Sequence, residues 1–429
     1  MRRFRGFFSA AVWLILLMIL LAGCGAGGGA AGSAGEPESG ARVAEESTGL
    51  PGAAGPSGAQ DTGPAWQDLQ KTGSMELRYA EMFAVDYFEA ADGGRPYALV
   101  TFGPPDREQS RCLLVPEGQA VPSGLEEDIT ALCLPLDHLY LASSSVMDFW
   151  RQLDALDAVS MTSTKEGDWS MPEVQEAIRS GSMRYAGKYS APDYEALLRD
   201  GCRLAIENTM IYHSPETAEK LESVGIPVLV EYSSYESHPL GRLEWIRLYG
   251  LMAGRGPEAE AFFEQKTRQL EGILSGMTEP SGKTAAFFYV TANGNINIHK
   301  PGGYVMNMIE MAGGTSVFTD LPEDDSALST MNLQMEQFYR QGKDADILLY
   351  NCTVDGELQD LNDLLGKSAL FSDFNAVQNG NVWCTGKNMF QETTCASDMI
   401  LELHSIFSGE AGDGRSLRYL RRLEQEQQE

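Results

Sequence analysis

The sequence is poor in histidine and in basic side chains, and both shortages reduce the range of functions that it can have. Its 429 residues include five histidines, and 32 lysines and arginines stand against 61 acids, which gives a formal net charge of −29. A chain this acidic repels nucleic acid and anionic lipid headgroups. We therefore expect no nucleic-acid partner, and either a soluble body or an acidic surface that meets a basic partner.

Three motifs of common enzymes are also absent. The sequence contains no HExxH, no GxSxG and no phosphate-binding GxxxxGK[ST]. The stretch that ends in Gly282-Lys283-Thr284 comes close to the last of these, but Met277 stands where its first glycine belongs. We therefore predict that the protein is not an enzyme; an enzyme anchored at the cell surface is the weaker alternative.

The seven cysteines form no CxxC pair, so their spacing does not predict a structural zinc site. Six of them follow residue 24, an even number that permits disulfides in an exported protein. Cys202 and Cys352 lie beside or within apolar runs, which favours buried side chains. Cys112 and Cys133 flank a predicted hairpin, and whether they pair stays open.

The N-terminus has the pattern of a secretion signal. Arginines at positions 2, 3 and 5 precede an apolar stretch from residue 7 to residue 21, and small residues with a cysteine follow. We interpret residues 1–23 as a signal peptide, because the apolar run is short for a transmembrane anchor. The sequence Leu21-Ala22-Gly23-Cys24 resembles a bacterial lipobox, which predicts a lipidated Cys24 and an extracytoplasmic protein anchored to the cell membrane.

Residues 24–72 are predicted to comprise this lipidated cysteine and a flexible linker. Between residues 25 and 64 the chain is rich in Gly, Ala, Ser, Pro and Glu and has almost no large apolar side chains, so it cannot bury enough surface to fold. A coil of this length spans about 35 Å on average, which lets the folded body move above the membrane.

Residues 73–255 have the pattern of an α/β lobe. Two short strands, YALVTFG and RCLLVPEG, form a small β element, and a strand over 137–142 leads to a helix from Val146. A strand over 203–207, a helix from Pro215 and a strand over 226–231 repeat the scheme. Strands and helices that alternate at this length predict βαβ units with a parallel sheet.

The same pattern returns over residues 279–429. We expect strands over 285–290 and within DADILLYNC and GNVWCTG, and helices within YVMNMIEMAGG, LQDLNDLLGKSAL and CASDMILELHSIFS. Residues 256–278 lie between the halves and form a predicted helix that Pro257 opens. About 20 helical residues span about 30 Å, which suits one helix that crosses between two lobes.

Several stretches, in this order, resemble the substrate-binding lipoproteins of ABC importers for iron–siderophore, haem and cobalamin-type ligands. They are YAGKYSAPDYEALLRDGCRLAIEN, YESHPLGRLEWIRLYGLMAGRGPEAEAFF, GGYVMNMIEMAGGTSVF and FNAVQNGNVWC. Each stretch alone is a weak signal, whereas their order and spacing behind a lipobox are a strong one. The resemblance covers roughly residues 73–408.

The resemblance implies two Rossmann-like lobes joined by one rigid backbone helix, with a ligand cleft between the lobes and little hinge closure. It also implies a monomer that hands its ligand to a membrane permease with its ATPase. An iron chelate of the siderophore type is the favoured ligand, because that is the broadest branch of the family; haem or a corrinoid is the alternative. We expect no intrinsic cofactor. A sensor or scavenger that works without a permease fits the same residues.

The ligand of an open α/β sheet lies beyond the carboxyl ends of its strands. Applied to both lobes, this rule selects the residues that follow each predicted strand as ligand contacts: Ser144, Ser145, Glu207, Asn208, Tyr212, Tyr232, Tyr235 and His238 in the first lobe, and Thr291, Asn293, His299, Lys300, Tyr304 and Asn351 in the second. Trp169 is a candidate wall of the cleft. Arg242 and Lys300 are candidates to meet carboxylates or the charge of a catecholate–iron complex.

Structural roles compete with these assignments. Ser143, Ser144 and Ser145 are alternatively caps of the next helix, and His238 before Pro239 is alternatively a turn residue. Arg242 and Glu244 alternatively form a solvated helix face. Tyr232 and Tyr304 alternatively cover the ends of the sheets.

Histidine chemistry raises two further alternatives. His299 either ligates haem iron in the cleft or is an ordinary loop histidine. A direct binder of bare Zn or Mn is weaker, because relatives with that function use three histidines and an acid spread over both lobes. Here His138 lies within a predicted strand and His404 within a predicted late helix, so such a set is hard to assemble. We predict no metal site.

The resemblance also suggests a docking surface for the permease. In the vitamin B12 branch, one exposed glutamate on each lobe docks to basic residues of the transporter. The matching regions here are SPETAEK, which offers Glu216, and TVDGELQD, which offers Glu357. Glu216 alternatively stabilises the positive end of its helix, and Glu357 alternatively is a solvated loop acid.

Overall fold

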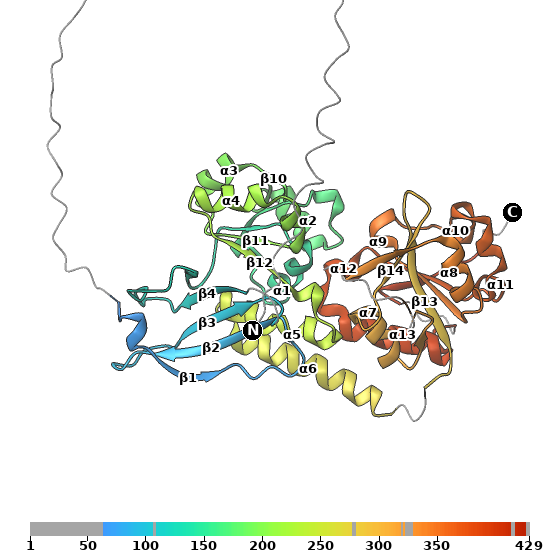
Figure 1. Cartoon of the computed structure of the whole chain (residues 1–429), viewed down its shortest axis with the longest axis horizontal. Helices are drawn as coiled ribbons and strands as arrows, with labels where there is room; N and C mark the ends of the chain where they lie inside the picture. The colour runs from blue at the N-terminus through green and yellow to red at the C-terminus, as the bar shows by residue number, and fades with distance from the viewer. Residues whose placement is uncertain are drawn as a thin grey trace, which may run out of the picture. The chain divides into compact units, whose positions relative to one another are not determined.

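The computed structural model describes residues 63–105, 109–276, 280–318, 321, 329–412 and 417–425. The predicted signal peptide, the predicted lipidation site Cys24 and most of the predicted linker lie outside these residues. Two α/β lobes follow one another along the chain with one long helix between them, which confirms the predicted fold class (Figure 1). Within the described part of the chain, no helix combines the length and apolarity that a membrane span requires.

The first lobe begins with a sheet of five strands in the order β1-β2-β3-β4-β5. The strands are β1 (Gln70–Ser74), β2 (Phe83–Glu89), β3 (Tyr97–Phe102), β4 (Ser110–Val115) and β5 (Ile129–Cys133). Neighbours are antiparallel except for the parallel pair β4 and β5, so the hairpin predicted between Cys112 and Cys133 is wrong. Cys112 pairs with Thr130 and Cys133 with Val115, three register positions apart, and both thiols are free.

The second sheet of this lobe is parallel throughout and has the order β12-β11-β6-β7-β8. Its strands are β6 (Leu139–Leu141), β7 (Val159–Thr162), β8 (Arg184–Tyr185), β11 (Leu204–Glu207) and β12 (Val228–Val230), and β9 (Gly187–Lys188) and β10 (Ala191–Pro192) form a small separate pair. The helices between and after these strands are α1 (Met147–Gln152), α2 (Pro172–Ser180), α3 (Tyr194–Asp200), α4 (Pro215–Ser223) and α5 (Pro239–Met252). The predicted βαβ pattern is therefore present.

The long helix between the lobes is α6 (Gly256–Leu274). Its buried residues Ala259, Phe263, Thr267 and Leu270 recur every three or four positions and form one stripe along the helix. Lys266 pairs with Asp398 of the second lobe at 2.7 Å. The sequence predicted a helix over 256–278, and residues 277–279 lie outside the described part of the chain.

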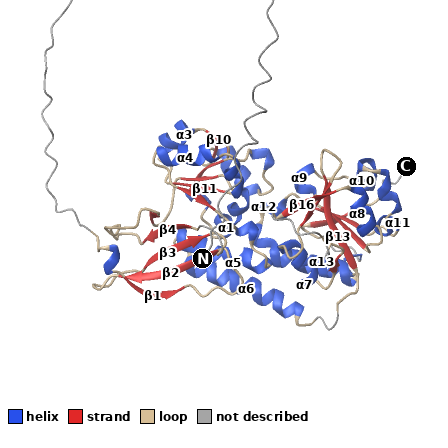
Figure 2. Ribbon diagram, viewed as in Figure 1, coloured by secondary structure: helices blue, strands red, loops and turns tan. Residues whose placement is uncertain are grey.

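The second lobe has a sheet in the order β16-β14-β13-β17-β18-β19, and β15 pairs with β13 beside β14. Its strands are β13 (Thr284–Val290), β14 (Ile296–His299), β15 (Thr315–Ser316), β16 (Thr330–Leu333), β17 (Ile347–Tyr350), β18 (Val382–Thr385) and β19 (Leu420–Arg422). Its helices are α7 (Tyr304–Met311), α8 (Met335–Gly342), α9 (Cys352–Asp355), α10 (Leu361–Lys367), α11 (Asn375–Gln378), α12 (Asn388–Gln391) and α13 (Ala396–Ser408), and Figure 2 shows them around this sheet.

Two buried carboxylates, one on α5 and one just before it, tie the start of the first lobe to this helix. Glu244 accepts hydrogen bonds from the backbone N–H groups of residues 78, 79 and 80, and Glu236 accepts those of residues 81 and 82, at distances of 2.8 to 3.0 Å. Trp245 Nε1 donates to Glu236 at 2.7 Å. Glu244 and Arg242 are both buried, so the alternative of a solvated helix face is wrong.

Direct hydrogen bonds join the two lobes beside α6. Asp148 on α1 is fully buried and accepts the N–H and the hydroxyl of Thr394 at 2.9 and 2.5 Å. The hydroxyl of Thr393 donates to the carbonyl of Ser145 at 2.5 Å. Gln391 Oε1 accepts the N–H and the hydroxyl of Ser170, each at 2.7 Å. These bonds fix the spacing of the two walls of the cleft.

Candidate ligand-binding site

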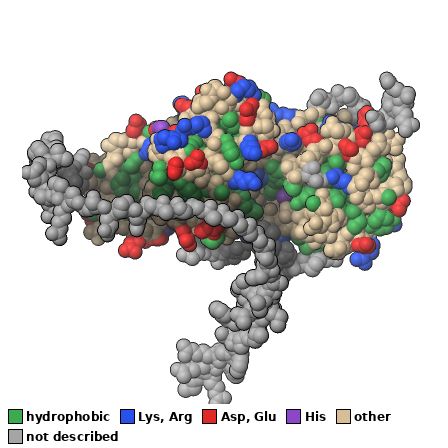
Figure 3. Space-filling model, turned by 90° about the horizontal axis from the view of Figure 1, so that it is seen from above, with side chains coloured by type: hydrophobic (Ala, Val, Ile, Leu, Met, Phe, Trp, Pro, Cys, Tyr) green, Lys and Arg blue, Asp and Glu red, His purple; other side chains and the backbone are tan. Residues whose placement is uncertain are grey.

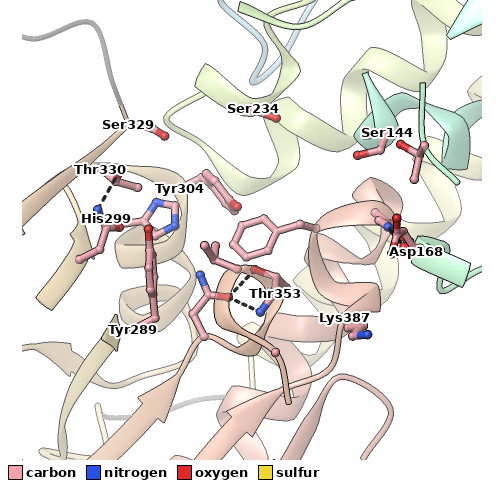
Figure 4. Close-up of a pocket in the computed structure, with 17 residues that line it drawn as sticks. Ser144, Asp168, Ser234, Tyr289, His299, Tyr304, Ser329, Thr330, Thr353 and Lys387 are labelled. Carbon is pink, nitrogen blue, oxygen red and sulfur yellow. Dashed lines mark hydrogen bonds between the residues drawn. The ribbon is translucent and has the colours of Figure 1, made fainter. Parts of the chain in front are cut away.

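A cavity of about 700 Å³ lies between the two lobes (Figure 4). Most of the residues that line it are polar: Ser144, Thr164, Asp168 and Ser234 from the first lobe, and Tyr289, Asn297, His299, Tyr304, Ser329, Thr330, Asn351, Thr353, Val354, Gly356, Lys387, Phe390 and Gln391 from the second. Figure 4 shows Ser144 and Asp168 across the cavity from His299 and Tyr289. Its volume suits a ligand larger than a bare ion.

A second compartment of about 360 Å³ adjoins this cavity. Five residues line both spaces: Ser144, Ser234, Ser329, Thr330 and Phe390. The remaining walls of the smaller compartment come mainly from the first lobe: Ser143, Ser145, Asn208, Thr209, Met210, Glu231, Tyr235 and Arg242. Figure 3 looks down on the molecule from above Figure 1 and shows acidic and basic side chains interspersed over this face.

The parallel sheets position many of these side chains. Ser143 to Ser145 follow β6, Asn208 follows β11, and Glu231 to Tyr235 follow β12. In the second lobe, Asn351 follows β17 and residues 387–391 follow β18. The walls therefore come from the carboxyl ends of the strands, where open α/β sheets bind their ligands.

Arg242 is the buried cation of the site. Its side chain is 3% exposed, and the guanidinium lies 4.1 Å from the centre of the Tyr304 ring. Its Nε has no hydrogen-bond partner, and across the described residues no acid forms an ion pair with it. A buried charge without a partner is costly, so Arg242 is suited to an anionic ligand group.

Glu231 is the buried acid of the smaller compartment. It is 2% exposed, and its carboxylate accepts the hydroxyls of Ser143 and Ser145 at 2.8 and 3.2 Å and the N–H of Ser233 at 2.7 Å. Ser143 precedes the short helix that follows β6, but its side chain does not cap that helix. The alternative role of Ser143 as a helix cap is therefore wrong. The serines instead hold Glu231 at the wall of the compartment.

His299 is a neutral imidazole on the wall of the larger cavity. It is 6% exposed, and burial, with a smaller effect of the positive charge on Arg242, lowers its pKa to about 3. Its ring stacks on Phe390 at 6.1 Å and meets Tyr304 edge-on at 5.4 Å, and its Nδ1 has no partner. Such a nitrogen can accept a hydrogen bond or ligate a metal.

Amide side chains complete the polar lining. Asn351 Oδ1 accepts the N–H and the hydroxyl of Thr353 at 3.1 and 2.5 Å, which fixes the start of α9. Asn297 on β14 donates across the strand pair to Asn332 on β16 at 2.8 Å. Over the residues that the structure describes, no group of three or more His, Cys, Asp and Glu side chains is arranged to hold a metal ion.

The structure brings half of the predicted ligand contacts to the two compartments. They share a position on the lining: Ser144, Ser145, Asn208, Tyr235, Arg242, His299, Tyr304 and Asn351. The other predicted contacts do not line either space: Trp169, Glu207, Tyr212, Tyr232, His238, Thr291, Asn293 and Lys300.

Two of these residues are buried inside the first lobe instead. Trp169 belongs to the core and donates from Nε1 to the carbonyl of Thr164 at 3.2 Å. Glu207 is 0% exposed, and neither of its oxygens has a partner. Ala205, two residues earlier on β11, packs in a cluster with Tyr140, and alternate residues of a strand share a face. Glu207 therefore points into the lobe, and burial raises its pKa to about 8.

The remaining predicted contacts that do not line the two compartments take part in local hydrogen bonds. His238 Nδ1 accepts the N–H of Leu240 at 3.1 Å and caps α5, as the alternative interpretation held. The hydroxyls of Tyr212 and Tyr232 bond to each other. Residues 291–295 form the tight turn between β13 and β14, where the N–H of residue 291 donates to the carbonyl of residue 295 at 2.8 Å. Lys300 lies beyond this hairpin, and its N–H donates to the carbonyl of residue 329 at 3.1 Å.

Sequence reasoning missed several lining residues. Lys387, Phe390 and Gln391 follow β18, a predicted strand, but the predicted ligand contacts include no residue after it. Thr164 and Asp168 follow β7, which was not predicted. The same strand-end rule finds all five once both strands are known.

The two predicted docking acids are on the surface. Glu216 is exposed in the first turn of α4, and Glu357 is exposed just after α9. Their role in docking to a permease stays a prediction.

The chain belongs to the periplasmic binding protein family, whose model matches residues 144–389. Among curated proteins it is 22% identical over 327 residues to an uncharacterized lipoprotein of Methanocaldococcus jannaschii, which covers 73% of this chain and 76% of the relative. The protein is thus a substrate-binding protein and not an enzyme, of a family that is extracytoplasmic and serves ABC importers.

Solved structures share the fold. The periplasmic haem-binding protein HutB of Vibrio cholerae is similar with a TM-score of 0.51 and 17% identity, over 63% of this chain and 99% of that one. A periplasmic binding protein of Veillonella parvula is similar with a TM-score of 0.54 and 15% identity, over 71% of this chain and 96% of that one. These likenesses concern the architecture of the two lobes.

Proposed function

We propose that this protein captures an iron chelate of the siderophore type in the interlobe cavity and delivers it to an ABC permease with its ATPase. The observation that carries this proposal is the buried guanidinium of Arg242, which has no acidic partner among the described residues and lines the cleft. Siderophore complexes expose oxygen atoms and often carry a net negative charge. A guanidinium donates charge-assisted hydrogen bonds to such oxygen atoms.

The rest of the lining supports the same class of ligand. Hydroxyls and amides dominate the 700 Å³ cavity, and tyrosine and phenylalanine rings supply contact area at its sides. A few placed polar groups within a cavity of this size are typical of small-molecule sites. The hydrogen bonds between the lobes favour a preformed cleft that closes little on binding.

Haem is the second candidate, and one observation favours it. His299 stays neutral and keeps an unpartnered Nδ1 at the cavity wall, with Tyr304 beside it. A neutral imidazole is a haem-iron ligand. The polar lining favours the iron chelate over haem, because a porphyrin ring needs broad apolar walls.

The test is to identify the cargo of protein purified from its own host, by native mass spectrometry together with an absorption spectrum. A visible charge-transfer band and the mass of an iron complex are expected. A Soret band would establish haem instead, and a corrin spectrum would establish a cobalamin; either result contradicts the iron-chelate proposal.

A second measurement tests Arg242 directly. Quenching of the intrinsic tryptophan fluorescence reports binding of a ferric tris-catecholate, a neutral ferric hydroxamate and haemin. Arg242→Met is expected to weaken the anionic catecholate at least ten-fold and the neutral hydroxamate less, because only the former uses the full charge. Equal loss for both ferric probes would contradict the role of the charge.

We also propose that the mature protein is a monomer held at the membrane by a lipid on Cys24. The pattern of the first 24 residues supports this, and so does the lipoprotein among its relatives. Cys24→Ala is expected to release the protein from the membrane fraction and to remove the mass of the acyl chains. Retention of the variant in the membrane fraction would contradict the anchor.

A further inference from the structure

The smaller compartment contains two opposite charges that do not neutralise each other. Glu231 and Arg242 both line it, and both are more than nine-tenths buried. They do not form an ion pair, because the guanidinium nitrogens of Arg242 and the carboxylate oxygens of Glu231, both in the described part of the chain, are more than 4.0 Å apart. A compartment of about 360 Å³ lies at their side chains instead.

The surroundings of Glu231 stabilise a carboxylate and leave it able to accept one more donor. An ionised carboxylate offers about four acceptor sites. The hydroxyls of Ser143 and Ser145 and the N–H of Ser233 use three of them. All three donors are neutral, so the negative charge of Glu231 is held in place and is not cancelled.

The surroundings of Arg242 likewise hold its charge without neutralising it. The guanidinium carbon lies 4.1 Å from the centre of the Tyr304 ring, which leaves the charge in place, and no hydrogen bond occupies the Nε edge of the group. A guanidinium has five N–H donors, and its Nε–H has no acceptor. A planar anion, such as a carboxylate, fits that edge in a bidentate manner.

We propose that this compartment is a subsite for a zwitterionic group of the cargo, whose ammonium faces Glu231 and whose carboxylate faces Arg242. The cargo is then an iron chelate built from amino acids that keeps one free α-amino carboxylate. This inference rests on the proposed function, and it adds the chemical class of the part of the cargo that enters the smaller compartment.

Opposite charges on one wall also select against simpler ions. A group that is only anionic would be attracted by Arg242 and repelled by Glu231, and a group that is only cationic would meet the reverse. Discrimination of this kind arises from the unfavourable contact as much as from the favourable one. A zwitterion satisfies both charges at once, and each charge-assisted hydrogen bond adds affinity.

The first experiment uses fragments small enough for the compartment. Saturation-transfer NMR compares L-leucine, N-acetyl-L-leucine and L-leucine methyl ester on the full-length protein. We expect L-leucine to bind at least ten-fold more tightly than either blocked form, because each block removes one charged hydrogen-bonding group. Equal affinity of the three fragments, or no binding of L-leucine at millimolar concentration, would overturn the proposal.

Variants assign each charge to one end of the fragment. Glu231→Gln keeps the shape, and its amide oxygen can still accept the hydroxyls of Ser143 and Ser145, although its NH2 group cannot accept the N–H of Ser233. It should abolish the preference for L-leucine over N-acetyl-L-leucine. Arg242→Gln should abolish the preference over the methyl ester. Glu207→Gln is the matched control, because Glu207 is a buried acid that lines neither compartment. A control that changes the preferences as much as Glu231→Gln would also overturn the proposal.

A second experiment separates the subsite from the iron-chelate function. Calorimetry compares ferric desferrioxamine B with its conjugate to the side-chain carboxyl of aspartate, which adds a free α-amino carboxylate. The conjugate is expected to bind at least ten-fold more tightly. Binding of both complexes with equal affinity would contradict the subsite but not the proposed function. Binding of L-leucine without binding of any ferric complex would contradict the proposed function but not the subsite.

Discussion

The guanidinium carbon of Arg242 lies 4.1 Å from the centre of the Tyr304 ring, and the two residues come from opposite lobes. Both are almost fully buried, and burial raises the pKa of the Tyr304 hydroxyl, so the ring stays a neutral phenol. The contact joins the two walls of the cleft at the point where its buried cation lies. The same residue pair therefore bears on the stability of the lobe interface and on the ligand site.

Replacement of Tyr304 tests this contact. Tyr304→Phe keeps the ring beneath the guanidinium, whereas Tyr304→Leu removes it. We expect Tyr304→Leu to lower the free energy of unfolding by about 2 kcal/mol more than Tyr304→Phe does, since a desolvated cation–π contact contributes about that much. Urea unfolding measures the difference, and equal losses in the two variants would show that the ring does not stabilise Arg242.

Asp148 should lock the two lobes together. It accepts two hydrogen bonds from Thr394 across the interface and one from Arg151 Nε at 2.9 Å. Asp148→Ala leaves the N–H and the hydroxyl of Thr394 buried and unpaired, whereas Arg151 keeps Glu173 and Glu392 at 3.6 and 3.9 Å. We expect a loss of about 3 kcal/mol in the free energy of unfolding. Asp157→Ala, at an exposed acid on the same lobe, is the control and should change little.

Scattering measures the same lock as a distance. The radius of gyration of the wild-type protein should not change when ligand binds, because the hydrogen bonds between the lobes already fix the cleft. The Asp148→Ala variant should show a larger radius than the wild type. A large ligand-induced closure of the wild type would contradict both the lock and the rigid-helix architecture.

The alternation of strands and helices could be predicted from sequence because its signals are local. Pro215 begins α4, and Pro257 lies in the first turn of α6, as expected for a residue without a backbone N–H. The buried strands of both lobes are short apolar runs, and such runs between helices predict a parallel sheet. Those signals lie within a few residues of each element and need no knowledge of the partner.

The direction of each side chain at a strand end could not be predicted in this way. Glu207 and Asn208 are neighbours, yet one points into the lobe and the other lines the smaller compartment. A shift of one residue in the end of the strand exchanges the two. Likewise, β14 pairs antiparallel with β13, which turns Thr291 and Asn293 into hairpin residues; only tertiary pairing determines that.

Glu207 should make the protein less stable as the pH rises. Burial raises its pKa from 4.5 to about 8, so the folded state keeps a proton that the unfolded state releases above pH 4.5. The associated stability is fully present below pH 4.5 and is lost as the pH rises to about 8, at about 1.4 kcal/mol per pH unit. Glu207→Gln removes this ionisation, and its gain in stability over the wild type should grow from pH 5 to pH 8 in urea titrations.

A constant difference between Glu207→Gln and the wild type across that range would contradict the assignment. Glu222→Gln is a suitable control, because Glu222 is an exposed acid of the same lobe.

His299 should make the protein less stable as the pH falls. Burial lowers its pKa from 6.5 to about 3, so below pH 6.5 the unfolded state binds a proton that the folded state does not. The associated stability is present above pH 6.5 and is lost as the pH falls towards 3, again at about 1.4 kcal/mol per pH unit. The NMR resonances of its ring should therefore stay unchanged between pH 8 and pH 5. Titration of the His299 ring near pH 6.5 would contradict its burial.

Charge reversal at the two exposed acids tests delivery to the permease. Glu216→Lys and Glu357→Lys together are expected to abolish uptake of a ferric chelate into cells, because both lobes would then repel basic residues of the transporter. The purified double variant should bind the same chelate with unchanged affinity, since neither acid lines the cleft.

Exchange of two other exposed acids, Glu195→Lys and Glu336→Lys, changes the net charge equally and should leave uptake intact. Uptake that survives in the Glu216 and Glu357 variant would disprove docking through these acids and would favour a role as a sensor or scavenger.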